Sequence, residues 1–240
     1  MKETIILLAL FCVVACEQQK GTLAKDALAD FTDARDGKKY KTVKINNQVW
    51  MAENLNFNAK GSKCYGEDGR IQFYNAQSYS YNYITLSSVE IQANCAKYGR
   101  LYDWYTAMDA CPNGWRVPSD DDWDKMYRFV DGGANPDNHP YGSEAAGKHL
   151  RAKEGWDNCG LSGSGKNSLC DDTHGFTALP GGYGSFDGNF RRAGQGGYWW
   201  SSSAHNSSRY IIYKYNSASY NTPHQNFLFS VRCLQENMLP

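Results

Sequence analysis

The stretch YGRLYDWYTAMDACPNGWRVPSDDDWDKMYRFV, residues 98–130, carries the strongest structural signals in the chain. Its second half predicts an amphipathic helix, because apolar side chains recur at intervals of three and four residues. Pro118 disfavours helix at the residue before it, Ser119 is a good N-cap, and Asp122 stands where a capping box needs an acceptor. The apolar positions are Trp123, Met126, Tyr127 and Val130. We expect this face to be buried.

The first half of the same stretch has a similar spacing and predicts a second short helix. Its apolar positions are Leu101, Trp104, Tyr105 and Met108. Two short helices with aromatic faces need a surface to cover, and much of the remaining chain has strand and turn signals. We therefore expect these aromatic side chains to form core rather than a ligand site.

The strand signals lie on both sides of this stretch. Asp36-Gly37 and Asn46-Asn47 are hairpin turns, so residues 31–57 predict a three-stranded meander. Near the C-terminus, residues 227–234 alternate between two faces and predict one strand. We expect residues 58–97 to form an irregular but ordered loop, and a short helix near residues 145–150.

The N-terminus predicts export. The apolar run TIILLALFCVVA after Met1-Lys2-Glu3 is too short to span a bilayer as a mature helix and is typical of a signal peptide, residues 1–15. It ends Val13-Val14-Ala15-Cys16, which resembles a bacterial lipobox with Cys16 as the lipidated residue. Residues 16–30 are small and polar, as in a tether. The sequence thus predicts a lipoprotein of the cell envelope, most naturally of the outer membrane, and does not define the side of the membrane on which it lies.

Besides Cys12 of the signal peptide and the lipobox residue Cys16, the chain has six cysteines. An even number in an exported chain indicates disulfides, although six cysteines allow 15 pairings and the sequence does not choose among them. Our hypothesis is Cys64–Cys95, Cys159–Cys170 and Cys111–Cys233. The spacings match no zinc motif and no histidine stands beside them, which favours structural disulfides over a metal site.

Several long motifs occur in one order along the chain. They are DARDGKKYKTVKINNQVWMAENLNF (33–57), KYGRLYDWYTAMDACPNGWRVPSDDDW (97–123), THGFTALPGGY (173–183), GYWWSSS (197–203) and FSVRCL (229–234). Together they resemble the Fibrobacter succinogenes major paralogous domain over about residues 31–235. More weakly, their order resembles the C-type-lectin-like fold shared with formylglycine-generating enzymes.

This resemblance implies a compact α+β domain in which two short helices pack on twisted antiparallel strands. It also implies that the N- and C-terminal strands lie close together. The family brings no established catalytic activity. Formylglycine-generating enzymes use a pair of reactive cysteines in their C-terminal part, where this chain offers only Cys233. The resemblance therefore favours a binding domain over an enzyme.

Other functional motifs are incomplete. Gly160, Gly165 and Lys166 nearly match a P-loop, but Asn167 replaces the magnesium-binding hydroxyl residue. No nucleophile elbow G-x-S-x-G is present, and the five histidines are scattered. The formal net charge is zero, which gives no electrostatic indication of nucleic-acid binding. We predict no catalytic residues, no metal site and no nucleic-acid partner.

Calcium is the one cofactor that stays open as an alternative. Lectins of the resembled fold bind it through Glu-Pro-Asn or Gln-Pro-Asp and Trp-Asn-Asp motifs, and Asn135-Pro136-Asp137 is the nearest fragment. Asp171-Asp172 and Asp187 are further oxygen donors. Acidic turns of this kind are also common without calcium.

Residues 201–226 have an unusual composition. Ser, Asn, Tyr and His fill 17 of the 26 positions, between the rigid sequences GYWW and FLFSVRC. Tyrosine supplies a large amphipathic contact and Ser and Asn supply adaptable hydrogen bonds, as in antibody paratopes. The segment also resembles the variable region of lectin-like proteins diversified by retroelements. A polar, solvated hairpin is the alternative.

From these observations we predict a lipid-anchored module that binds an extracellular glycan or protein. The candidate ligand-binding residues are His205, Asn206, Tyr210, Tyr213, Tyr215, Asn216, Tyr220, Asn221 and His224. Arg232 and Trp115 are expected to be scaffold. The alternatives are a structural or matrix component of the envelope and an enzyme of the formylglycine-generating type.

Overall fold

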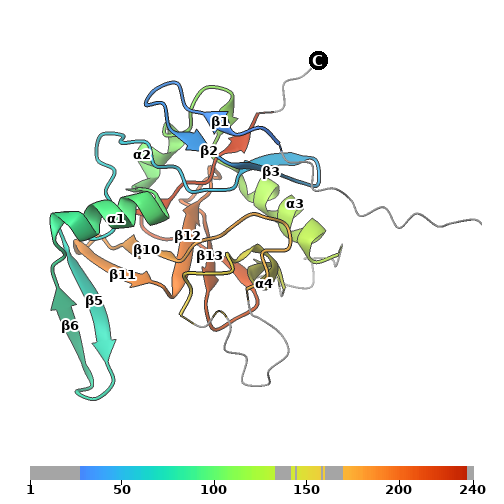
Figure 1. Ribbon diagram of the computed structural model, residues 1–240. Coiled ribbons are helices and arrows are strands. Elements are labelled where there is room, and N and C mark those ends of the chain that lie inside the picture. The colour runs from blue at the N-terminus through green and yellow to red at the C-terminus, as the bar shows by residue number, and fades with distance from the viewer. Residues whose placement is uncertain (1–27, 133–141, 144, 158, 160–169, 237–240) are drawn as a thin grey trace, which may run out of the picture.

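The computed structural model describes residues 28–132, 142–143, 145–157, 159 and 170–236, a mixed α+β domain (Figure 1). The predicted signal peptide, Cys16, the P-loop-like residues and the Asn135-Pro136-Asp137 fragment lie outside this part of the chain. The described helices are α1 (Ser88–Tyr98), α2 (Trp104–Met108), α3 (Asp120–Val130) and α4 (Ala146–Leu150). The last of these is the short helix expected near residues 145–150.

A large mixed sheet forms most of the domain. Its path runs β6-β5-β11-β10-β12-β13-β14-β9, and β15 joins it through β12 and β7. The strands are β5 (Arg70–Asn75), β6 (Ser80–Ile84), β7 (Leu101–Tyr102), β9 (Gly142–Ser143), β10 (Gly181–Gly184), β11 (Asn189–Ala193), β12 (Gly196–Trp200), β13 (Ser208–Ile212), β14 (Ala218–Asn221) and β15 (Phe229–Ser230). Most pairings are antiparallel, as expected, but β5–β11, β10–β12 and β12–β15 are parallel. The β5–β6 hairpin projects from the body at one end of this sheet (Figure 1).

Two smaller sheets hold the N-terminal strands. β1 (Phe31–Thr32) pairs with β2 (Lys39–Tyr40), while β3 (Thr42–Ile45), β4 (Gln48–Met51), β16 (Leu234–Gln235) and β8 (Trp115–Arg116) form a four-stranded sheet. The two predicted hairpin turns are therefore present, with Asn46 at φ 54°. The single meander was wrong, because β2 pairs only with β1 among the described strands. Pairing of β4 with β16 places the N- and C-terminal strands side by side.

The second predicted helix of the opening stretch is confirmed as α3. Ser119 and Asp122 form the capping box, and all four predicted apolar side chains are buried. The ring of Trp123 lies 4.9 Å from that of Trp50 and 6.0 Å from that of Phe176. Burying side chains of this size stabilises a fold by roughly 1.5–3 kcal/mol each. The aromatic face of α3 is therefore core, as expected.

The other predicted helix is present as α2, but it begins later than predicted. Leu101 belongs to strand β7, which pairs with β15, and helix α2 begins only after its N-cap Asp103. Asp103 accepts a hydrogen bond from Thr106 N at 2.7 Å, so the capping side chain sets the helix start. Tyr105 is consequently exposed rather than part of a buried face.

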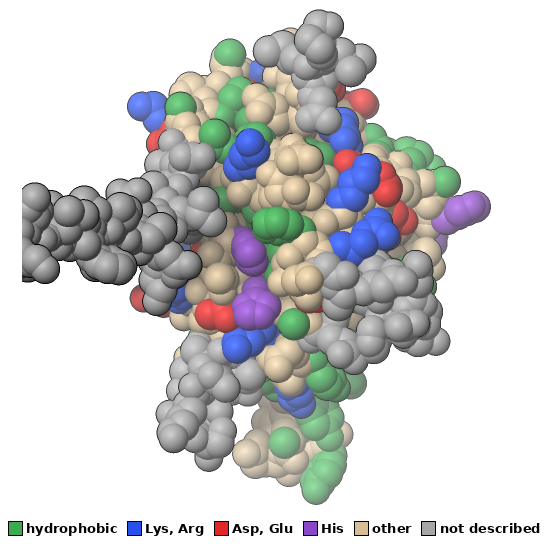
Figure 2. Space-filling model, turned by 90° about the vertical axis from the view of Figure 1, so that its right-hand side faces the viewer, with side chains coloured by type: hydrophobic (Ala, Val, Ile, Leu, Met, Phe, Trp, Pro, Cys, Tyr) green, Lys and Arg blue, Asp and Glu red, His purple; other side chains and the backbone are tan. Residues whose placement is uncertain are grey.

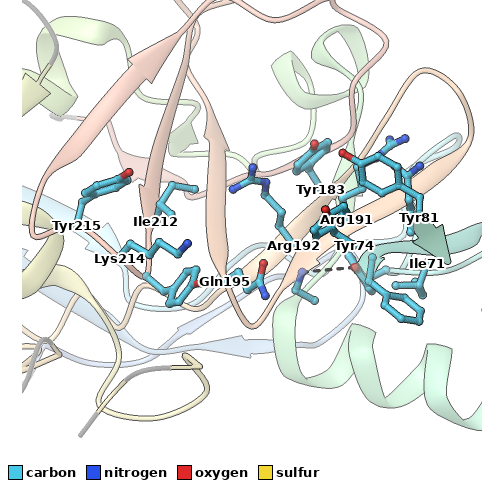
Figure 3. A pocket seen from close by; sticks show the side chains of 15 residues that line it. Ile71, Tyr74, Tyr81, Tyr183, Arg191, Arg192, Gln195, Ile212, Lys214 and Tyr215 are labelled. Atoms are coloured by element: carbon cyan, nitrogen blue, oxygen red, sulfur yellow. Dashed lines mark hydrogen bonds between the residues drawn. The ribbon is translucent and has the colours of Figure 1, made fainter. Parts of the chain in front are cut away.

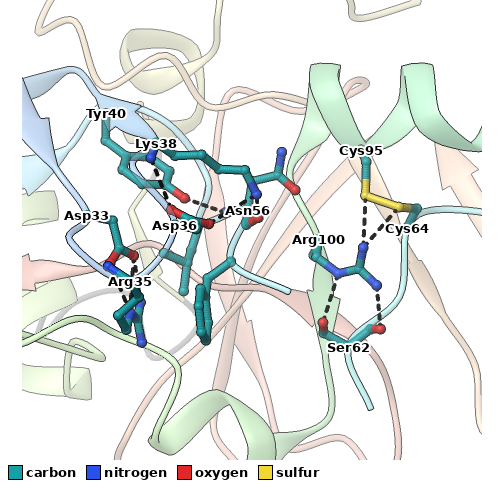
Figure 4. Close-up of polar contacts among 12 residues, drawn as sticks. Asp33, Arg35, Asp36, Lys38, Tyr40, Asn56, Ser62, Cys64, Cys95 and Arg100 are labelled. Atoms are coloured by element: carbon teal, nitrogen blue, oxygen red, sulfur yellow. Dashed lines mark hydrogen bonds and ion pairs between the residues drawn. A yellow bond between two sulfur atoms is a disulfide. The ribbon is translucent and has the colours of Figure 1, made fainter. Parts of the chain in front are cut away.

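Three disulfides join the six described cysteines in the pairing that the sequence analysis favoured: Cys64–Cys95, Cys111–Cys233 and Cys159–Cys170. The first fastens α1 to the segment before β5. Arg100 reinforces it by donating to Ser62 Oγ at 2.8 Å and Ser62 O at 2.7 Å, with its guanidinium against both sulfurs (Figure 4).

The expectation of an irregular loop over residues 58–97 was wrong. This segment contains β5, β6 and α1, whose start is fixed by a capping box between Ser87 and Glu90. The hairpin was missed because its polar and aromatic side chains do not alternate between an apolar and a polar face. The helix was missed although the spacing of Ser87 and Glu90 is visible in the sequence.

The expected single strand over residues 227–234 is divided into β15 and β16. Residues 231–233 between them fill the interior, where both alternating faces are buried. Arg232 is fully buried and donates to Asn54 Oδ1 at 2.7 Å and to backbone carbonyls of Phe176 and Thr177. Arg232 and the buried Trp115 are thus scaffold, as predicted.

Candidate functional site

The candidate site begins where two strands of the large sheet separate. β5 and β11 run parallel and pair only at Arg70–Asn189 and Ile71–Phe190. Gly69 allows the approach, since a Cβ at that position would lie 2.3 Å from the Gly188 carbonyl oxygen. Beyond Ile71, β5 continues with β6 and β11 continues with β10. A pocket occupies the resulting split.

This pocket, here called the hairpin lobe, has a volume of about 730 Å³. Figure 3 shows Tyr74 and Tyr81 entering it from the hairpin, and Gln195, Lys214 and Tyr215 from the far side. Arg191, Arg192 and Tyr183 lie between the two sides (Figure 3). The lobe is therefore built from segments more than 100 residues apart in the sequence.

A second pocket of about 550 Å³, the C-terminal lobe, adjoins the first. The two lobes share Tyr183, Arg192, Ile212 and Tyr215. The C-terminal lobe is further lined by Tyr198, Ser208, Tyr210, Asn221, Pro223, Phe227 and Phe229. We call the two lobes together the groove. Two adjoining lobes suit a ligand built of more than one unit.

Hydrogen bonds fix the polar side chains where β5 and β11 separate. Asp187 accepts two hydrogen bonds from Arg191, and the pKa of this carboxyl lies well below its usual range, chiefly because of that contact. Arg191 also donates through Nε to Gln72 Oε1, and Gln72 Nε2 donates to Tyr83 OH at 2.7 Å. These contacts tie the hairpin to the sheet beside the groove.

Burial strengthens the preference of two groove-side phenols for the protonated form. It raises the pKa of Tyr65 to about 12 and raises that of Tyr198 well above its usual value. Tyr65 OH accepts a hydrogen bond from Ala193 N at 3.4 Å. Both hydroxyls are therefore neutral hydrogen-bonding groups at physiological pH.

Side chains along β12, β13 and β14 alternate between the two faces of the sheet, and this alternation decides which C-terminal residues reach the groove. Tyr198, Tyr210 and Ser219 stand opposite one another across the three strands. The intervening side chains, including Arg209 and Ile211, are buried on the other side. Arg209 forms ion pairs there with Asp120 and Asp124.

Four of the nine predicted ligand-binding residues line the groove: Tyr210, Tyr213, Tyr215 and Asn221. The remaining five lie outside its described lining. His205 and Asn206 form the β12–β13 turn at φ 67° and 56°, and Tyr220 lies over Arg209 with its ring 5.6 Å from the guanidinium carbon. Asn216 accepts a backbone hydrogen bond from Lys148, and His224 accepts one from Asn226 N.

Sequence reasoning missed the residues that other segments bring to the groove. They are Tyr65, Tyr74, Tyr81, Tyr183, Arg191, Arg192 and Gln195. The sequence shows the concentration of tyrosine in residues 73–83, but the approach of this hairpin to β11 depends on parallel strand pairing. Lys214 lies inside the predicted segment, but the composition that marks this segment consists of Ser, Asn, Tyr and His and gives no signal for a lysine.

A second polar cluster surrounds α4. Asp171 contacts His149 Nδ1 at 2.9 Å and Thr173 Oγ1 at 2.5 Å, and Lys148 Nζ lies 3.8 Å away. Figure 2 views a face on which histidines gather beside acidic and basic side chains. Although burial raises the pKa of Asp171, the hydrogen bonds from Thr173 and His149 lower it overall. Within the described residues, no group of three His, Cys, Asp or Glu side chains is arranged to hold a metal ion.

The other acidic residues predicted as possible calcium ligands have protein partners. Asp172 accepts hydrogen bonds from Thr177 N at 2.8 Å and Thr177 Oγ1 at 2.9 Å, and Asp187 is paired with Arg191.

The described part of the chain contains no helix that is both long and apolar enough to cross a membrane.

These features define a disulfide-bonded α+β domain, consistent with an extracytoplasmic protein, with a tyrosine-rich groove on its large sheet. The chain belongs to the Fibrobacter succinogenes major domain family, whose model matches residues 43–235. No curated protein and no solved structure matches it.

Proposed function

We propose that this protein is a cell-envelope recognition module that binds an extracellular glycan or protein in the groove. The observation that carries this proposal is the convergence of tyrosines from the β5–β6 hairpin, β10, β12 and β13 on one concave surface. Tyrosine combines a large contact area with few rotatable bonds, so ordering it on binding costs little. Tyr74, Tyr81 and Tyr215 are each more than half exposed, as side chains that await a ligand would be.

The envelope location is part of the same proposal. The lipobox ending at Cys16 would attach the mature chain to a membrane, most naturally the outer membrane, with residues 16–30 as tether. Cys16→Ala should abolish incorporation of labelled palmitate and release the protein from the membrane fraction. Retention of the label by the variant would contradict lipidation at this residue.

The groove is tested by screening the disulfide-bonded protein on glycan and surface-protein arrays. The test variant is Tyr74→Ala/Tyr215→Ala, with one tyrosine from each side of the groove. The matched control is Tyr105→Ala/Tyr220→Ala, which removes two exposed tyrosines outside its described lining. Binding by the wild type and the control but not by the test variant is expected. Equal binding by all three would move the site elsewhere.

Two finer points belong to the proposal. A distant relationship to the C-type-lectin-like fold is supported by the adjacent N- and C-terminal strands. Retroelement diversification of residues 201–226 is supported by the composition of that segment, and by its Tyr210, Tyr213 and Tyr215 reaching the groove. Comparison of the codons with a template repeat tests the latter.

A structural role is the second candidate, and the hairpin favours it. β6 is the end strand of the large sheet among the described strands, and Tyr79, Tyr81 and Tyr83 are exposed on or next to it. Hydrophobic side chains cover much of this projecting part (Figure 2). An exposed edge strand can pair with another chain. Concentration-dependent self-association in sedimentation experiments would support this role, and a strictly monomeric protein would oppose it.

A further inference from the structure

The charges of the groove are all of one sign among its described lining residues. Arg191, Arg192 and Lys214 line it, whereas no described lining residue is Asp or Glu. Asp187 neutralises Arg191 from outside. Neither Arg192 nor Lys214 forms an ion pair with a carboxylate of the described residues. A concave surface with unneutralised positive charge attracts anions.

Arg192 has the more informative position of these two cations. It contributes to both lobes and interacts with the Tyr198 phenol, so it stands where the lobes meet. Its backbone has φ 65°, a conformation that costs a non-glycine residue about 1 kcal/mol or more. A glycine would satisfy this turn with less strain. The turn thus carries an arginine, and not a glycine, at the point where the two lobes meet, and we take this as support for a role of the guanidinium.

The neutral lining matches a polyhydroxylated chain. The rings of Tyr183 and Tyr198 meet edge to face at 4.9 Å, and those of Tyr198 and Tyr210 stack at 6.0 Å, so aromatic rings line this part of the groove. Gln195 and Asn221 add amide groups at the two lobes. Flat apolar rings combined with amide donors and acceptors suit the alternating C–H and hydroxyl surfaces of sugar rings.

Building on the proposed function, we infer that the groove binds an acidic polysaccharide, a sugar chain that carries carboxylate or sulfate groups. Arg192 would hold an acid group at the centre of the groove, because a guanidinium can bind two oxygens of one oxyanion through two parallel hydrogen bonds. Lys214 would act on a neighbouring unit in the hairpin lobe. The tyrosines would stack on the sugar rings.

The test compares acidic polymers with their neutral counterparts. Binding of the disulfide-bonded protein is measured with polygalacturonate and its methyl ester, and with dextran sulfate and dextran. The test variant is Arg192→Gln/Lys214→Gln. Its matched control is Lys125→Gln/Arg128→Gln, which removes the same charges from α3. Poly-L-glutamate serves as an acidic peptide.

The wild type and the control should bind at least one acidic polymer about tenfold or more tightly than its neutral counterpart. The test variant should lose that preference. Equal binding of acidic and neutral polysaccharides, abolished by Tyr74→Ala/Tyr215→Ala, would overturn the acidic-ligand inference and leave the proposed function standing. Tighter binding of poly-L-glutamate would also overturn it, in favour of an acidic protein. Binding to none of these polymers would count against the inference, and an additional failure on the arrays would remove the proposed function as well.

Discussion

Asp122 holds the start of α3 against the four-stranded sheet, and its replacement by asparagine tests the energetics of the core. The carboxylate accepts two hydrogen bonds from Arg116, at 2.6 and 3.0 Å, and two from Ser119, at 2.8 Å from the backbone and 2.7 Å from the hydroxyl. Asparagine at this position would keep the shape of the side chain but lose its charge. The amide nitrogen of the substituted side chain would also face one of these donors.

The pKa of Asp122 gives the size of the effect. Burial raises this pKa, but the hydrogen bonds from Arg116 and Ser119 outweigh it and lower the pKa from 3.8 to about 2. A shift of this size corresponds to about 2 kcal/mol of folding free energy at neutral pH. Because the folded-state pKa is the lower one, this stabilisation is present above about pH 4 and is lost as the pH falls toward 2. About half should remain at pH 3.

Urea unfolding of the wild type and Asp122→Asn at pH 7 and pH 3 measures this stabilisation and its dependence on pH. We expect a loss of about 2 kcal/mol at pH 7 and about half as much at pH 3. Asp121→Asn is the control: its exposed carboxylate pairs only with Lys125 among the described ion pairs, so the loss should stay below about 0.5 kcal/mol. A loss for Asp122→Asn as small as that for the control, or one that does not change with pH, would show that the Arg116 and Ser119 contacts do not supply this stabilisation.

Three further substitutions test other parts of the fold. Cys111→Ser/Cys233→Ser should lower the free energy of unfolding by about 4–5 kcal/mol, measured with urea, because the disulfide closes a separation of 122 residues; an unchanged midpoint would contradict this. Ser87→Ala should cost about 1 kcal/mol through the lost N-cap of α1, seen as a lower thermal midpoint. Gly182→Ala should destabilise more than Gly114→Ala: both have positive φ, but a Cβ at 182 would lie 2.4 Å from a backbone oxygen of β11, whereas one at 114 meets nothing within 4 Å. Equal losses would disprove the packing argument.

Local signals predicted the parts of the fold that depend on neighbouring residues. The N-cap and the apolar spacing of α3 were enough to predict this helix, because the residues that start a helix lie within its first one or two turns. The β3–β4 turn at Asn46-Asn47 was equally local. Local signals could not predict that residues 231–233 run through the interior, because the burial of Arg232 depends on carbonyl groups from residues 51, 176 and 177.

The sequence predicted only the C-terminal half of the groove, because the other half depends on contacts between distant segments. Composition located the C-terminal tyrosines that line it, and strand register then separated Tyr210 from Tyr220 by the face on which each lies. The hairpin half requires β5 to pair with β11 across more than 100 residues. No signal within either segment specifies a parallel contact between them. Arg192 likewise acquires its significance only from its position between the lobes.

The proposed function requires the hairpin and the C-terminal strands to form one binding site. Tyrosine modification by iodination, read by mass spectrometry with and without a saturating acidic polysaccharide such as polygalacturonate, tests it directly. Tyr74, Tyr81 and Tyr215 should all be protected, while the equally accessible Tyr105 and the exposed Tyr220 react unchanged. Protection confined to one side of the groove, or protection of Tyr105 and Tyr220 instead, would show that the hairpin and the C-terminal strands do not form one site.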